Sequence, residues 1–161
     1  MIRYVKVRPV KSPSRGTAFS AGIDFFVPND FQESIVRPNE DILIPSGLIM
    51  EIPEHCALLG VDKSGIASSR VAKERCGMVE KNANLPSAVI VGAKLIDADY
   101  PGEIHIHLIN VAQVPIVIQP GQKIAQFMLV PVFYDNPIEV SAEEMHIVGS
   151  ERVGGFGSTG K

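Results

Sequence analysis

The sequence of 161 residues lacks the features that mark several large classes of protein. Its two cysteines, Cys56 and Cys76, have no CxxC spacing, so we expect structural thiols kept reduced and no disulfide framework. No run approaches the roughly 20 apolar residues of a membrane-spanning helix, and the N-terminus alternates apolar and basic residues where a signal peptide would be continuously apolar. We therefore expect a soluble, cytoplasmic protein with no membrane partner.

An excess of basic residues is also absent. Lys and Arg number 15 against 18 Asp and Glu, which gives a net charge of −3 and leaves no basic stripe for a polynucleotide backbone. We expect no polynucleotide partner. The 45% apolar content is nevertheless sufficient for one buried core, and the length is that of one domain.

Short β-prone runs recur at intervals of roughly eight to twelve residues, and proline or glycine ends most of them. This rhythm predicts an all-β sandwich or barrel. Residues 103–109 alternate polar and apolar side chains, which places Ile104 and Ile106 on one face of a strand and His105 and His107 on the other. We expect this strand to be exposed on one side.

Turns and one helix complete the expected local structure. Pro-Ser-Gly at 45–47 and Pro-Gly at 101–102 and 120–121 suit tight turns between antiparallel strands. Residues 68–77 begin with serine, continue with good helix formers and end at Gly77, which predicts one short helix.

Two segments contain residues suited to chemistry on a phosphorylated ligand. Residues 95–102 place Asp97 and Asp99 on the same side of an extended chain, as metal-assisted hydrolysis requires; the alternative is a turn whose carboxylates bond nearby amides. Residues 153–161 combine glycine amides and hydroxyls with one aromatic, Phe156, and could enclose an anion under a stacked ring; the alternative is a disordered terminus.

Three further segments are weaker signals. Residues 62–67 contain a cation and a hydroxyl ahead of the predicted helix. Residues 121–126 contain an amide side chain at the start of a strand, and residues 21–25 contain an acid within an apolar strand. Each also has a structural explanation: a polar loop, an ordinary strand after a turn, or a buried, hydrogen-bonded aspartate.

Taken along the chain, residues 21–25, 62–67, 95–102, 121–126 and 153–161 resemble the first to fifth motifs of the trimeric dUTPases, which convert dUTP to dUMP and pyrophosphate. The resemblance covers residues 21–161 and ends on the specific sequence GGFGSTG. It implies a jelly-roll-like all-β subunit, a homotrimer whose active sites are shared between chains, dUTP as the substrate and Mg²⁺ as the cofactor. In that family the reaction keeps uracil out of DNA and supplies dUMP for dTMP synthesis.

The resemblance also implies a role for each matched residue. Asp97 matches the general base that activates water, Tyr100 the aromatic under the deoxyribose, and Asp24 an acid that meets Mg²⁺ through water while the triphosphate holds the metal. The hairpin at 91–95 reads uracil with its backbone. The implied substrate-binding residues are Lys63, Ser64, Gly65, Gly92, Lys94, Tyr100, Gln126, Arg152, Gly155, Phe156, Gly157, Ser158 and Thr159.

The resemblance divides the chain into a β domain at 1–149 and a C-terminal arm at 150–161 that closes over the nucleotide. The spacing between the second and third motifs is longer than usual, which indicates an insertion near 68–88 and suggests a contact with a partner protein as a hypothesis. Lys63 replaces the usual arginine and Lys94 a common glycine.

Two other functions are compatible with the same motifs. A dCTP deaminase has the same fold, but that family uses a glutamate at the position of His107. A nucleotide-binding regulatory trimer would use the insertion to contact its partner, although Asp97, Tyr100 and the arm favour an active hydrolase.

Overall fold

The computed structural model describes residues 1–62 and 89–145, and within these ranges the chain forms strands and no helix. The predicted helix at 68–77 and Cys76 lie outside the described residues, whereas Cys56 is a free, half-buried thiol. Nothing in the described ranges is a helix long and apolar enough to cross a membrane. The strands are β1 (Arg3–Lys6), β2 (Ser14–Arg15), β3 (Ile23–Phe26), β4 (Ser34–Val36), β5 (Asp41–Pro45), β6 (Leu48–Glu51), β7 (Cys56–Val61), β8 (Val89–Val91), β9 (Leu95–Ile96), β10 (His105–Asn110), β11 (Ile116–Ile118) and β12 (Lys123–Pro131).

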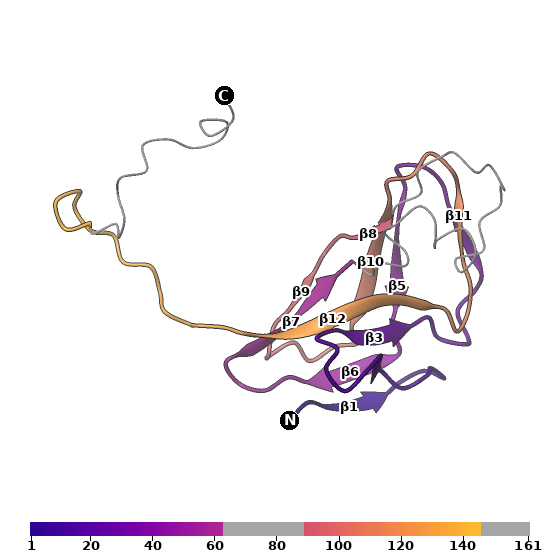
Figure 1. Ribbon diagram of the computed structural model, residues 1–161, viewed down its shortest axis with the longest axis horizontal. Helices are drawn as coiled ribbons and strands as arrows, with labels where there is room; N and C mark the ends of the chain where they lie inside the picture. The colour runs from indigo at the N-terminus through magenta and orange to yellow at the C-terminus, as the bar shows by residue number, and fades with distance from the viewer. Residues whose placement is uncertain (63–88, 146–161) are drawn as a thin grey trace.

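The strands pair into four antiparallel sheets that give a jelly-roll-like all-β fold, as predicted (Figure 1). The largest sheet has the order β2-β3-β12-β7-β9, with β12 hydrogen-bonded to β3 on one side and β7 on the other. A second sheet has the order β5-β10-β8, and β1-β6 and β11-β4 form two-stranded ribbons. Neighbours in these sheets are often far apart in sequence, so long-range pairing builds the body.

One hydrophobic core joins the two larger sheets. Phe25 of β3 and Phe127 of β12 are fully buried, with ring centroids 4.5 Å apart. Ile104 and Ile106 are buried as well, whereas His105 is exposed and His107 half-buried, which confirms the alternation predicted for this strand.

Of the three predicted tight turns, the one at 120–121 occurs, whereas 45–47 and 101–102 are bends. Gly47 and Gly121 both have φ near 75°, in the left-handed region that glycine adopts without strain. Gly47 lies at a bend between β5 and β6, and a Cβ there would lie 2.9 Å from Cγ1 of Val10. The backbone therefore needs glycine at this bend for both conformation and space.

An ion pair fastens the first strand to the sheet. The guanidinium of Arg3 on β1 donates to the carboxylate of Glu51 on β6, and these two residues are also register partners. This hydrogen bond holds the pKa of Glu51 below its usual range.

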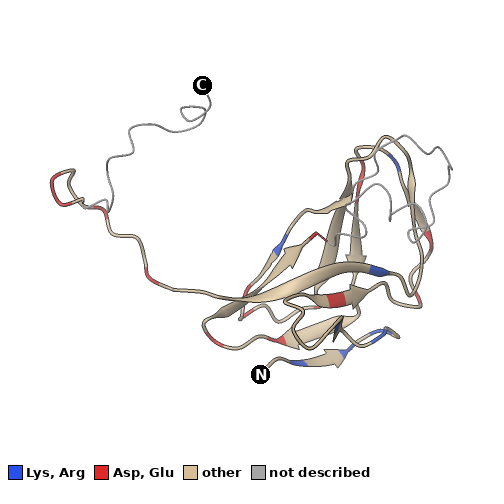
Figure 2. Ribbon diagram, in the orientation of Figure 1, with Lys and Arg blue, Asp and Glu red and all other residues tan. Residues whose placement is uncertain are grey.

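Residues 132–145 leave the body beyond β12 as an extended segment (Figure 1). Phe133 and Ile138 are about 85% exposed in the isolated chain, and Met145 is exposed as well. The segment contains four acidic residues and no lysine or arginine, whereas basic residues gather along the N-terminal strand and the loop after it (Figure 2).

Candidate functional site

Asp97 lies at the turn that follows β9. Ile96 and Ala98 pack against the core, so the residues between and after them, Asp97 and Asp99, face outward on the same side. Both aspartates line a pocket of about 620 Å³, together with Ile52, Glu54, Ala98 and Tyr134. The two carboxylates are thus open to solvent and to a ligand of nucleotide size.

The hairpin between β8 and β9 approaches this turn and is held from three sides. The Val91 N–H donates to Oδ1 of Asp62 at 2.7 Å, and the Lys94 carbonyl accepts from the Gly60 N–H at 2.6 Å. On the third side, the Gly92 N–H donates to the His107 carbonyl at 2.8 Å. Gly92 and Lys94 therefore lie in a loop whose backbone is fixed by β7 and β10.

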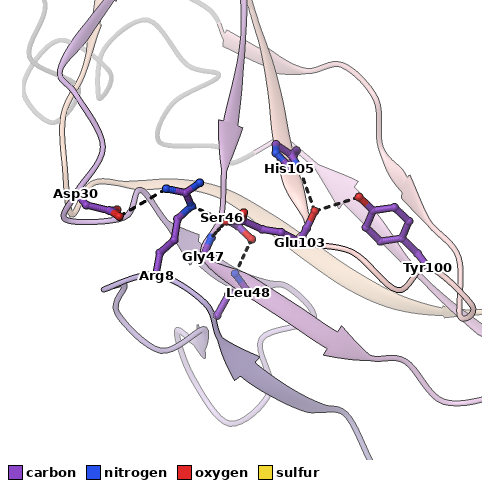
Figure 3. A network of polar contacts seen from close by, with 8 residues as sticks. All are labelled: Arg8, Asp30, Ser46, Gly47, Leu48, Tyr100, Glu103 and His105. Atoms are coloured by element: carbon purple, nitrogen blue, oxygen red, sulfur yellow. Dashed lines mark hydrogen bonds and ion pairs between the residues drawn. The ribbon is translucent and has the colours of Figure 1, made fainter.

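Tyr100 is positioned by a polar network around Glu103 (Figure 3). Its hydroxyl donates to the Glu103 carbonyl at 3.1 Å, and Nδ1 of His105 donates to the same oxygen at 2.9 Å. A Cβ at Gly102 would lie 2.9 Å from the Tyr100 hydroxyl, so the ring rests against this glycine. The ring is still 41% exposed and can accept a flat ligand.

The Glu103 carboxylate anchors the network to the body. It accepts from the buried Gly47 N–H at 2.7 Å and from Nε of Arg8 at 3.0 Å, and Arg8 also pairs with Asp30 at 3.5 Å (Figure 3). The segment that carries Tyr100 is thereby tied to the bend between β5 and β6 and to the segment after β1.

Replacing Glu103 by alanine should lower the free energy of unfolding by about 1–3 kcal/mol, because the buried Gly47 N–H loses its acceptor. Urea denaturation monitored by circular dichroism would measure this. Glu54→Ala is the matched control, since Glu54 is exposed and makes a surface ion pair of 3.9 Å with His55; it should change stability by less than about 1 kcal/mol. Equal losses in the two variants would contradict the anchoring role of Glu103.

Asp24 and Gln126 lie side by side on β3 and β12, and Val61 of β7 is the next partner across the sheet. The Gln126 side chain donates to the Asp62 carbonyl at 3.0 Å and fills the space that a side chain at Gly22 would occupy. Gln126 therefore holds the end of β7, immediately before Lys63, against the start of β3.

Asp24 is 4% exposed, and Nζ of Lys123 donates to its Oδ2 at 2.7 Å. Burial of a carboxylate is costly unless it is paired, and Lys123 supplies that pairing charge. Asp24 is therefore buried and hydrogen-bonded, as the structural explanation of this residue predicted.

The described residues bring together the first and fourth motifs, the residue that begins the second motif and the hairpin that precedes the third, whereas the pocket of Asp97 and Asp99 is lined by none of Asp24, Asp62 and Gln126. Asp62 makes the connection, since its carbonyl accepts from Gln126 and its carboxylate accepts from the hairpin that leads to Asp97. Lys63, Ser64, Gly65, Arg152, Gly155, Phe156, Gly157, Ser158 and Thr159 lie outside the described residues.

Sequence reasoning missed the side-chain roles of Asp62, Glu103, Lys123 and His107. Three of them lie in or next to a motif, but each acts on a residue at least 14 positions away, which no local pattern reveals. His105 and His107 both use a ring nitrogen in hydrogen bonds to the protein, and within 1–62 and 89–145 no three His, Cys, Asp or Glu side chains gather as a metal site.

Comparisons with solved structures define the class of fold. A dUTPase of Staphylococcus bacteriophage 80alpha, solved with dUpNHpp, superposes with a TM-score of 0.73 at 20% identity over 100% of this chain and 99% of the other. A dUTPase from phage phi11 of S. aureus gives 0.69 at 18% identity, over 91% of this chain and 99% of the other. The fold is that of the dUTPases.

Sequence comparisons identify the family. The dUTPase family model matches residues 79–160. A deoxyuridine 5'-triphosphate nucleotidohydrolase of Desulfitobacterium hafniense (strain DSM 10664 / DCB-2) is 34% identical over 99% of this chain and 94% of its own length. The protein of the same name from Neisseria meningitidis serogroup C is 35% identical over 92% and 87%. The chain belongs to the dUTPase family.

Proposed function

We propose that this protein is a dUTP diphosphatase that hydrolyses dUTP to dUMP and pyrophosphate. The observation that carries the proposal is Asp97, which is exposed beside Asp99 in a pocket of about 620 Å³. Membership of a family whose curated relatives are named deoxyuridine 5'-triphosphate nucleotidohydrolase supplies the substrate. The cellular role that follows is to keep uracil out of DNA and to supply dUMP for dTMP synthesis, in the cytoplasm.

In the proposed mechanism Asp97 acts as the general base. Its carboxylate accepts a proton from a water molecule while the water oxygen attacks the α-phosphorus of dUTP. The bond from that phosphorus to the bridging oxygen breaks, and pyrophosphate leaves with the bonding electrons. Because Asp97 is exposed at the pocket, it can reach such a water without rearrangement of the fold.

Substrate selection is assigned to two elements. The backbone of residues 91–95, fixed by β7 and β10, reads the uracil edge and leaves no room for the thymine methyl group. The Tyr100 ring, held by Glu103, lies under the sugar and excludes a 2′-hydroxyl.

Phosphate binding is assigned to the end of β7 and to β12. Gln126 holds the Asp62 carbonyl, and Lys63, Ser64 and Gly65, which follow in the sequence and lie outside the described residues, are assigned to the phosphate chain. The side-chain amide of Gln126 already donates a hydrogen bond to the Asp62 carbonyl, so its proposed role is to hold the chain at the end of β7.

Magnesium is proposed as the cofactor, and a dUTPase from phage phi11 is described with a structural Mg(II) ion. Mg²⁺ commonly binds one or two carboxylates together with substrate phosphates, and the single buried carboxylate of Asp24 beside Lys123 fits a contact through water better than direct ligation. When bound with the triphosphate, the ion neutralises phosphate charge. This help matters because the protein itself carries a net charge of −3.

We further propose a homotrimer in which residues 150–161 of one chain close over the nucleotide of another, with Arg152, Ser158 and Thr159 on the phosphates and Phe156 on the uracil. The extended segment 132–145 supports this assembly, because its exposed Phe133 and Ile138 need a surface outside their own subunit. The division into a β domain at 1–149 and an arm at 150–161 belongs to the same proposal. The insertion near 68–88 lies outside the described residues, and its contact with a partner protein is a hypothesis.

A panel of nucleotides tests the reaction directly. We expect pyrophosphate from dUTP with Mg²⁺, at least 10²-fold less from dCTP, dTTP and UTP, and no ammonia from any of them, since a missing or misplaced polar contact costs about this factor or more. Pyrophosphate and ammonia should be measured in separate assays on the same samples. Ammonia from dCTP would instead support the deaminase, and nucleotide binding without turnover would support the regulatory trimer.

A further inference from the structure

His107 of β10 lies directly against the loop at 91–95. Its Nδ1 accepts a hydrogen bond from the Ala93 N–H at 2.9 Å, and its carbonyl accepts from the Gly92 N–H at 2.8 Å. A Cβ at Gly92 would overlap the imidazole ring, so the glycine and the ring are in close packing. One residue therefore holds two successive amides of this loop.

The hydrogen bonds determine which ring nitrogen is protonated. A backbone N–H can only donate, so Nδ1 must be the unprotonated acceptor toward Ala93. The proton of the neutral ring is then on Nε2, which lies 3.0 Å from Oδ2 of Asp41 on β5 and donates to it. Asp41 thus fixes the tautomer that the loop requires, as a carboxylate commonly does for a functional histidine.

The loop depends on His107 because its other contacts lie at its two ends. Asp62 holds Val91 at the start, and Gly60 holds the carbonyl of Lys94 at the end. Between them, the Ala93 amide is exposed at the surface and is oriented by the imidazole alone among the hydrogen bonds formed within the described residues.

We propose that His107 is a positioning residue for base selection: its neutral imidazole, oriented by Asp41, fixes residues 92–94 in the conformation that accepts uracil. The inference rests on the proposed function, in which residues 91–95 read the base. His107 touches no substrate atom in this scheme, and it acts on affinity and selectivity through the loop backbone.

Two variants of nearly the same size as histidine test the hydrogen-bond acceptor at position 107. In His107→Asn, Oδ1 can occupy the place of Nδ1 and accept from Ala93, whereas His107→Leu has similar size and no acceptor. We expect Asn to keep kcat/KM for dUTP within about threefold of wild type and Leu to lower it about tenfold, the scale of one lost hydrogen bond. The loss should appear in KM with kcat nearly unchanged, and the preference for dUTP over dTTP and dCTP should fall by a similar factor.

A third variant tests the role of Asp41. Asp41→Ala leaves the imidazole in place but removes the acceptor for Nε2–H, so it should give a smaller rise in KM than His107→Leu, and the double variant should lose no more than His107→Leu alone. A full additive loss in the double variant would show that Asp41 does not act through His107.

The outcomes separate this inference from the proposed function. A wild-type protein that does not hydrolyse dUTP overturns the proposed function, whereas an active wild type with equal KM values in His107→Asn and His107→Leu overturns only the role of His107. If both variants fail to fold, long-range ¹H–¹⁵N NMR of wild-type imidazoles decides instead. Unprotonated Nδ1 that shifts when dUMP binds is the expected result, and a proton on Nδ1 would contradict the proposal.

Discussion

Asp97→Asn is expected to lower kcat for dUTP by about 10²–10⁴-fold, the range that a positioned general base contributes. The amide is almost the same size as the carboxylate but cannot accept the proton of the attacking water. Because Asp97 is exposed, folding should be unaffected. Stopped-flow or pyrophosphate-release kinetics would give kcat, and titration with a non-hydrolysable analogue should show nearly unchanged affinity.

Asp99→Asn is the matched control, since Asp99 lies in the same pocket and the charge change is identical. If the loss in Asp97→Asn came only from reduced negative charge near the triphosphate, both variants would behave alike. We expect a clearly smaller effect at Asp99. Full activity of Asp97→Asn would remove the basis of the proposed mechanism.

Truncation after Gly149 is expected to leave a folded protein whose kcat for dUTP falls by about 10²-fold, the scale associated with loss of correct positioning at a reacting group. The removed residues include Arg152, Phe156, Ser158 and Thr159, which the proposal places on the phosphates and the base. Closure of this arm would also exclude water and strengthen electrostatic contacts around the scissile bond.

A chain that ends at Gly160, without Lys161, is the control for shortening the C-terminus and should retain activity. Circular dichroism and size-exclusion chromatography would verify that both truncated proteins fold and assemble like the full chain. Aggregation of the protein that ends at Gly149 would show a structural role for the tail, and unchanged kcat would exclude the tail from the active site.

The alternation of residues and the turn chemistry made much of the fold predictable. The alternating run at 103–109 became part of β10, and Gly121 took the positive φ that its turn requires. β2 and β4 were not predicted, because strands of two and three residues contain too few side chains to show a period. Sheet order was beyond sequence reasoning, since it depends on pairings such as β1 with β6 that no local signal encodes.

The site was predictable where its chemistry lies within one short segment. The outward placement of Asp97 and Asp99 follows from their spacing of two residues in an extended chain. The contacts of Asp62 with Val91, Glu103 with Gly47 and Lys123 with Asp24 span 29, 56 and 99 positions, so only the folded chain reveals them. The resemblance placed Gln126 on phosphate, while the fold shows its side chain occupied between β3 and β7.

Because of the extended segment at 132–145, part of the free energy that stabilises this protein is gained within a single chain and part only when chains associate. Phe133 and Ile138 stay about 85% exposed while a subunit is alone, so most of their contribution to stability arises on association and follows mass action. In the proposed trimer, dilution therefore weakens the same contacts that guide each tail toward its neighbour. Newly synthesised chains would reach full stability only when their concentration allows them to meet.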